Sequence, residues 1–126
     1  MEIKILILGV ASLFFSACSA DTLNPSNFND VYVKDFHSDK PKECTTSDVN
    51  LSHKQAKEFF ERSKIVDRKK IHDNYAHAPC YIEGTLKYKG KLCDWKIRAG
   101  STGSVKCGDK TWLFACDDCD SLFTQK

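Results

Sequence analysis

The chain has 126 residues, of which 41% are hydrophobic and 29% are charged, and its formal net charge is +2. This length fits one domain with its own core, and the near balance of charge excludes the strong basic bias that nucleic-acid binders usually show. Seven cysteines are many for such a chain, and their interpretation depends on the compartment in which the protein folds.

The N-terminal residues have the organisation of an export signal. Lys4 provides a positive charge, and the apolar run ILILGVASLFF at residues 5–15 has the length of a signal-peptide core. The run is too short to cross a bilayer as a helix, which needs about 20 apolar residues. We therefore expect residues 1–17 to be a signal peptide.

The end of this signal is compatible with two cleavage chemistries. Residues 15–18, FSAC, resemble the lipobox of bacterial lipoproteins, with phenylalanine where the pattern usually has leucine. The resemblance implies cleavage before Cys18, lipidation of its thiol with palmitate-type acyl chains and, because Ser19 follows, sorting to the outer membrane on its periplasmic side. Two or more acyl chains hold a soluble domain firmly on a membrane, at about 0.8 kcal/mol per buried CH₂. The alternative is cleavage after Ala20 by signal peptidase I.

Residues 18–29 are predicted to be a flexible tether that follows the lipid anchor. The stretch SADTLNPSNFND is rich in serine, asparagine, aspartate and proline, and it shows no hydrophobic periodicity. We expect a single domain over residues 30–126.

Six cysteines remain when Cys18 is set aside as lipidated, and an even number in an exported chain predicts a disulfide framework. They are Cys44, Cys80, Cys93, Cys107, Cys116 and Cys119. Six cysteines allow fifteen pairings, among which spacing alone does not choose. Each bridge would stabilise the domain by about 2–4 kcal/mol.

The first half of the domain is predicted to hold a strand and a helix. Residues 31–35, VYVKD, have the β-branched alternation of a short strand, and a loop follows at 37–50. A helix is expected over 51–63, because Ser52 and Gln55 have the spacing of a capping box. Its buried face is predicted by helical periodicity to comprise Ala56, Phe59, Phe60 and Ser63. The following stretch, to residue 75, either continues this helix or forms a second short one.

From residue 80 the hydrophobic period changes to two. Alternation predicts four strands, separated by glycine-containing turns, at residues 80–88, 92–99, 104–107 and 111–116. We therefore predict an α+β fold, in which an antiparallel meander sheet of four to five strands is packed on one side by one or two helices and stapled by disulfides. The C-terminal Leu122 and Phe123 are expected to dock as a short helical turn.

The stretch CDDC, which contains Cys116 and Cys119, is the strongest candidate for chemistry. A Cys-x-x-Cys pair is redox-active when a helix N-terminus favours the thiolate. Here two aspartates separate the thiols and disfavour that thiolate, and no βαβ pattern surrounds the motif. A structural disulfide is therefore the preferred interpretation.

Neither a metal nor a cofactor is predicted. Zinc sites commonly use two close cysteine pairs, whereas this chain has one Cys-x-x-Cys unit. Asp117, Asp118 and Asp120 resemble oxygen ligands for calcium, but the chain lacks the regular loop with its central glycine.

Three further features carry weaker signals. His72 and His77 offer a general base, although a pair of surface histidines in a loop is the simpler interpretation. Residues 98–103, RAGSTG, would cradle a phosphate only if a helix began there, so a hairpin turn is preferred. The basic run of Arg68, Lys69 and Lys70 is either a solvated helix end or a contact with an anionic surface.

These observations favour a membrane-anchored, non-enzymatic binding or inhibitor module whose partner is a protein of the cell envelope. An immunity factor against an envelope-acting toxin and a lysozyme inhibitor are concrete forms of this hypothesis. It rests on analogy with small, exported, cross-linked domains, whose rigidity reduces the entropy lost on binding. The alternative is a small periplasmic enzyme, either a thiol–disulfide enzyme that uses Cys116 and Cys119 or a hydrolase that uses a histidine.

Overall fold

The computed structural model describes residues 23–124, so Cys18 and the predicted signal peptide lie outside the described residues. None of the described helices is long and apolar enough to cross a membrane. In chain order the elements are η3 (Pro25–Asn27), β1 (Asn29–Ser38), η4 (Thr46–Asp48), α1 (His53–Arg62), β2 (Lys64–Val66), α2 (Arg68–Asn74), β3 (Cys80–Tyr88), β4 (Lys91–Arg98), β5 (Thr102–Cys107), β6 (Lys110–Ala115) and α3 (Asp120–Thr124).

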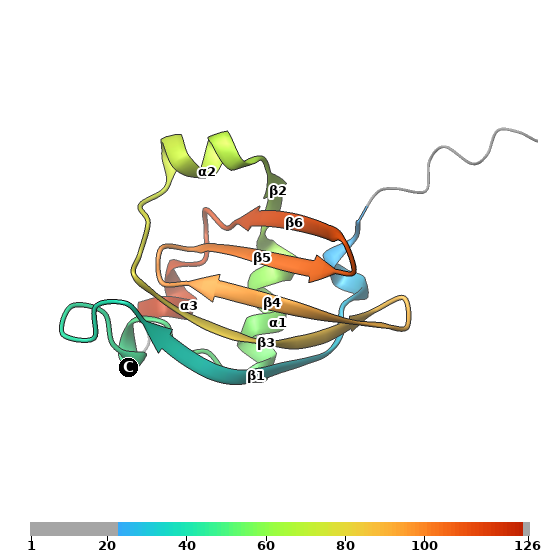
Figure 1. Ribbon diagram of the computed structural model, residues 1–126, viewed down its shortest axis with the longest axis horizontal. Helices are drawn as coiled ribbons and strands as arrows, with labels where there is room; N and C mark the ends of the chain where they lie inside the picture. The colour runs from blue at the N-terminus through green and yellow to red at the C-terminus, as the bar shows by residue number, and fades with distance from the viewer. Residues whose placement is uncertain (1–22, 125–126) are drawn as a thin grey trace, which may run out of the picture.

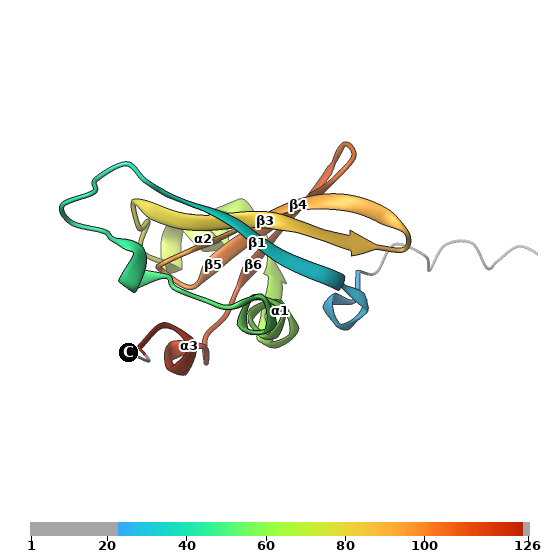
Figure 2. The same cartoon turned by 90° about the horizontal axis from the view of Figure 1, so that it is seen from below.

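The strands of the described residues form one antiparallel sheet, in the spatial order β1-β3-β4-β5-β6-β2 (Figure 1). The consecutive strands β3 to β6 are the predicted meander, and β1 and β2 occupy the two edges. Figure 2 shows α1 and α3 on the same face of the sheet, while α2 lies beyond β6, on the side away from β1 (Figure 1). The predicted α+β class is confirmed, whereas the sheet has six strands instead of four to five.

The additional edge strand is β2, which the sequence pattern does not predict. Of the two alternatives for this region, a continued helix or a second short one, the structure has the second, and that helix begins at Arg68. Before it, three residues pair with β6, and Ile65 lies opposite Phe114. Three residues are too few for alternation to be recognised, so pairing with β6 decides the conformation of this segment.

Helix α1 begins where the capping signal places it. The Ser52 side chain accepts a hydrogen bond from the Gln55 backbone N–H at 3.1 Å, and the Gln55 side chain accepts one from the Ser52 backbone N–H at 2.9 Å. This reciprocal pair satisfies two backbone donors at the start of the helix. The side chains of Ala56, Phe59 and Phe60 are fully buried, as the helical spacing predicts.

Phe60 lies in the middle of an aromatic cluster between α1 and the sheet. Its ring makes edge-to-face contacts with four rings, at centroid separations of 5.6, 5.3, 5.8 and 5.2 Å from Phe28, Phe59, Trp95 and Phe114. This geometry is favoured by the ring quadrupoles and adds to the gain from burial. The cluster therefore holds α1 against the inner surface of β4 and β6.

The packed domain begins before residue 30, where the predicted tether ends. Leu23 is 5% exposed and Phe28 is fully buried. Between them η3 is capped by Asn24, whose side chain accepts a hydrogen bond from the Ser26 backbone N–H. Two isolated apolar residues in a polar segment produce no periodicity, but their burial makes residues 23–29 part of the domain.

Strand β1 is longer and less regular than the predicted strand at residues 31–35, and its register with β3 shifts twice. Gly84 of β3 pairs with Val33 next to one of these shifts. A Cβ atom on Gly84 would collide with the backbone carbonyl oxygen of Tyr32. Glycine at this position therefore allows the irregular part of β1 to approach β3 closely.

The cysteines of the described residues form three disulfides, which confirms the predicted framework and selects one of its fifteen pairings. The pairs are Cys44–Cys80, Cys93–Cys107 and Cys116–Cys119, at sequence separations of 36, 14 and 3. The first ties the loop after β1 to the start of β3. The second joins β4 to β5, and the third closes the turn between β6 and α3.

Candidate binding groove on the outer sheet face

The alternation of β3 to β6 turns one set of side chains towards α1 and the other set towards the opposite face, which we call the outer face. Two of the hollows that residues 23–124 form on this outer face concern the site. The smaller one, of about 330 Å³, mixes charges of both signs, from Lys34, Asp35, Glu83, Asp94, Lys96 and Lys106.

The larger hollow, which we call the α2 groove, lies between α2 with its following loop and the outer face of β4, β5 and β6. Its volume is about 640 Å³, which is within the range of small-molecule sites, about 300–1,000 Å³. Among the described residues, no aspartate or glutamate lines it. Its polar lining includes Arg68, His72, His77, Lys96, Arg98 and Ser104.

Tyr81 positions two cations of the α2 groove. The Lys96 Nζ lies 4.8 Å from the centroid of the Tyr81 ring, and the Arg98 Cζ lies 4.9 Å from it. The negative face of an aromatic ring attracts cations, and the strand register places Arg98 directly opposite Tyr81. His37 of β1 packs against the same ring at 5.2 Å. Two like charges are therefore held beside one ring.

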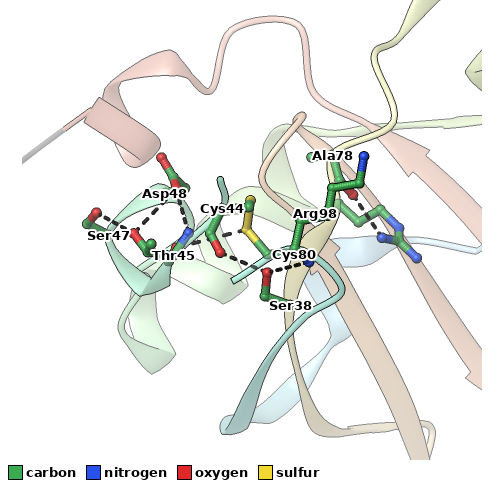
Figure 3. The surroundings of a disulfide bond; sticks show 9 residues. Ser38, Cys44, Thr45, Ser47, Asp48, Ala78, Cys80 and Arg98 are labelled. Carbon is green, nitrogen blue, oxygen red and sulfur yellow. Dashed lines mark hydrogen bonds between the residues drawn. A yellow bond between two sulfur atoms is a disulfide. The ribbon is translucent and has the colours of Figure 1, made fainter. Parts of the chain in front are cut away.

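A backbone contact and a disulfide fix the surroundings of Arg98. Its Nη1 donates a hydrogen bond to the Ala78 carbonyl oxygen at 3.0 Å (Figure 3). Ala78 lies two residues before Cys80, whose disulfide to Cys44 ties this loop to the chain after β1. The Ser38 hydroxyl in turn donates to the Cys44 carbonyl oxygen at 2.8 Å. The loop after α2, which forms one wall of the groove, is therefore held both by β4 and by the chain after β1.

Asp117 joins α2 to the end of the sheet. Its carboxylate accepts a hydrogen bond from the Tyr75 hydroxyl and forms an ion pair with the Lys64 Nζ at 2.8 Å. The hydrogen bond from Lys64, followed by that from Tyr75, lowers the pKa of Asp117 below its ordinary value. The bond to Asp117 also raises the pKa of the Tyr75 hydroxyl. We call this trio the α2 clamp.

Acid is expected to release the α2 clamp, and the substitution Asp117→Asn is expected to abolish this response. A carboxyl group whose pKa is lowered by folding stabilises the folded state above its unfolded pKa of about 4. That stabilisation is lost as the pH falls through the folded-state pKa. The ring-proton chemical shifts of Tyr75, at the end of α2, should therefore change during acidification, followed by NMR, with a midpoint below that of an unperturbed aspartate.

The matched control for this titration is Asp109→Asn. It removes the same charge from the exposed turn between β5 and β6, and it should leave the transition of α2 unchanged. Because the charged groups of the clamp, Lys64 and Asp117, are exposed, we expect a small effect on global stability. An Asp117→Asn variant that retains the wild-type transition would contradict the clamp.

The structure brings together features that the sequence offers only separately. Arg68, His72 and His77 line one side of the α2 groove, and residues of the 98–103 stretch line the other. That stretch is a hairpin turn between β4 and β5, as predicted. Of the basic run, Lys69 pairs instead with Asp73 at 2.6 Å.

The CDDC stretch offers no accessible thiol. Cys116 and Cys119 are bonded to each other and are 2% and 0% exposed, so an attacking thiolate reaches neither sulfur easily. Carboxylates lie within 4.8 Å of two disulfides, Asp118 at this one and Asp48 at Cys44–Cys80. Since the thiolate is the form of cysteine that binds metals, neither group offers a thiolate site while its disulfide is closed.

Lys96, Ser104 and Tyr75 are groove residues that sequence reasoning does not single out. Alternation already places Lys96 on the same face as Arg98, and the strand register adds Ser104 opposite Lys96. Tyr75 carries no such signal, because its place depends on how α2 returns towards β6.

No known family model matches the chain, and neither a curated protein nor a solved structure matches it. The fold and the site define an exposed, disulfide-linked antiparallel sheet with a basic groove on its outer face.

Proposed function

We propose that the chain is an exported lipoprotein, anchored through Cys18 in the outer membrane and facing the periplasm. Its domain acts there as a non-enzymatic binding or inhibitor module of the immunity type, and its partner is a protein of the cell envelope. The outer face of the sheet is the surface that engages this partner.

This proposal rests on the rigidity of the outer face. Strands β3 to β6 are paired along their length, and disulfides link β3 to the loop before α1 and β4 to β5. The backbone of such a fixed surface loses little conformational entropy when it binds. The smaller hollow adds charges of both signs, which suits the electrostatic complementarity of a specific protein interface.

Cysteine pairing supports the export and anchoring part of the proposal. Each of the six cysteines among the described residues belongs to a disulfide, and such a framework is typical of an oxidising compartment. Of the seven cysteines in the sequence, only Cys18 lies outside these three disulfides. Lipidation would explain why an exported protein has this odd cysteine.

The proposal predicts that the natural protein begins at an acylated Cys18, and that its soluble form, starting at Ser19, captures one specific envelope protein of its host. Mass spectrometry of the N-terminal peptide tests the first part. Affinity capture tests the second, with the partner identified by mass spectrometry. Reversing a charge in the smaller hollow, Glu83→Lys, should reduce the captured amount about tenfold, since like-charge contacts oppose binding.

Glu43→Lys is the matched control, because it makes the same charge reversal in an exposed loop and should leave capture unchanged. A natural protein cleaved after Ala20 would contradict the anchor. Equal capture by the Glu83→Lys and wild-type chains would contradict the assignment of the surface. Activity on a small substrate, with no specific partner, would contradict a binding module.

A further inference from the structure

The α2 groove carries charge of one sign. Arg68, Lys96 and Arg98 contribute three cationic side chains, and no carboxylate from the part of the chain that the structure describes lines the groove. Thr102 and Ser104 add hydroxyl groups. The neighbouring hollow on the same face mixes both signs, so the one-sided charge is a property of this groove and not of the whole outer face.

These cations have no carboxylate partners among residues 23–124. Glu83 is directly opposite Lys96 in the strand register, yet the Lys96 ammonium lies over the Tyr81 ring. Several other cations do form ion pairs with acidic side chains, namely Lys57, Arg62, Lys64 and Lys69. The groove therefore keeps positive charge that no carboxylate of residues 23–124 neutralises through an ion pair.

The two carboxylates that contact lining residues are engaged elsewhere. Asp73 pairs with Lys69 at 2.6 Å as well as contacting His72. Asp117 pairs with Lys64 while it accepts the hydrogen bond from Tyr75. Neither is among the residues that line the groove, so an anion that enters would meet cations and hydroxyls.

Arg98 is held ready for such an anion. Its guanidinium rests beside the Tyr81 ring, and one nitrogen donates to the Ala78 carbonyl oxygen. A guanidinium has five N–H donors, so four remain after this bond. Because the side chain is already fixed, binding would cost little rotamer entropy.

We propose that the α2 groove binds an oxyanion, and that a phosphoryl group matches it best. Donors come from three elements: Arg68 from α2, Lys96 and Arg98 from β4, and Ser104 from β5. A planar carboxylate is satisfied by one guanidinium fork, whereas a phosphoryl group offers acceptor oxygens in several directions. The volume of about 640 Å³ leaves room for the organic part of a phosphate ester.

This site does not rest on the proposed protein partner, because its ligand is a small anionic group. The probe is inorganic phosphate, titrated by NMR at constant ionic strength into the chain starting at Ser19, which contains every described residue. We expect saturable shifts at the amides of residues 68–77 and 96–104. Arg98→Gln should weaken binding about tenfold or more, because a charge-assisted hydrogen bond is lost.

Two further variants keep the test decisive. If circular dichroism shows that Arg98→Gln disturbs the fold, the exposed Lys96→Gln takes its place with the same expectation. Lys110→Gln removes an equal charge from the opposite end of the β5–β6 hairpin and should leave binding unchanged. A response to chloride equal to that with phosphate, or binding that is the same in all variants, would overturn the proposal.

A second experiment separates a free phosphate compound from a lipid headgroup. The same chain is sedimented with vesicles of phosphatidylglycerol in phosphatidylcholine. Co-sedimentation that Arg98→Gln abolishes and inorganic phosphate competes away supports the proposal with a lipid as the source. Saturable phosphate binding without co-sedimentation supports it with a free compound. Co-sedimentation unaffected by Arg98→Gln, without phosphate binding, would overturn it.

Discussion

Replacing Phe60 by alanine is expected to lower the free energy of unfolding by about 3–5 kcal/mol, the usual cost of removing a buried aromatic side chain. Phe60 is fully buried, and its ring makes edge-to-face contacts with Phe28, Trp95 and Phe114, which all lie outside α1. Removal leaves a cavity that the surrounding strands, fixed by pairing and disulfides, fill poorly. Urea denaturation followed by circular dichroism measures the loss.

Phe60 also packs beneath the strand that carries part of the outer face. Trp95, which it contacts, is flanked on β4 by residues of the outer face, Lys96 among them. A matched substitution at an exposed position, Leu92→Ala, should change stability by less than about 0.5 kcal/mol, since Leu92 is 67% exposed. Phe60→Leu should cost less than Phe60→Ala, because it fills part of the cavity. An alanine variant as stable as the Leu92→Ala control would contradict the central place of Phe60.

Elements with strong local signals could be predicted from the sequence. The capping pair of Ser52 and Gln55 and the spacing of Phe59 and Phe60 define α1 without reference to the rest of the chain. Strands β3 to β6 are joined by short turns, so alternation and turn residues are sufficient to place them. Each of these signals lies within a few residues of the structure that it specifies.

Elements whose structure depends on distant partners could not be predicted in the same way. Strand β2 exists because Ile65 and its neighbours pair with β6, far along the chain. Leu23 and Phe28 are buried because the core has space for them, although their own segment resembles a tether. Local propensity is a weak guide where tertiary contacts decide.

The groove follows the same rule. Alternation along residues 92–99 is sufficient to place Lys96 and Arg98 on one face, and Arg68 belongs to a basic run that the sequence shows directly. No local sequence pattern predicts that the end of α2 packs near the sheet, where the Tyr75 hydroxyl donates a hydrogen bond to Asp117. The candidate site is therefore made of individually weak signals that the fold brings together.

Breaking the Cys44–Cys80 disulfide is expected to have a comparably large effect. The bond closes a loop with a sequence separation of 36, for which the chain-entropy relation gives about 4 kcal/mol of stabilisation. Cys44→Ser together with Cys80→Ser removes it without leaving a free thiol at either position. Urea denaturation of the double variant, against the wild-type chain, measures the loss.

The matched control is the pair Cys116→Ser and Cys119→Ser. Its sequence separation is 3, so the same relation gives a smaller loss, about 2 kcal/mol.

The two disulfides also differ in which part of the fold they hold. Cys80 lies two residues after Ala78, which accepts the hydrogen bond from Arg98 (Figure 3), whereas Cys116 and Cys119 lie at the turn before α3. Loss of the first bond should therefore loosen the wall of the α2 groove, and amide hydrogen exchange at residues 76–80 should increase in that variant and not in the control. Equal losses of stability in both double variants would show that loop length does not set the contribution of these bonds, and unchanged exchange at residues 76–80 would show that the disulfide does not hold the groove.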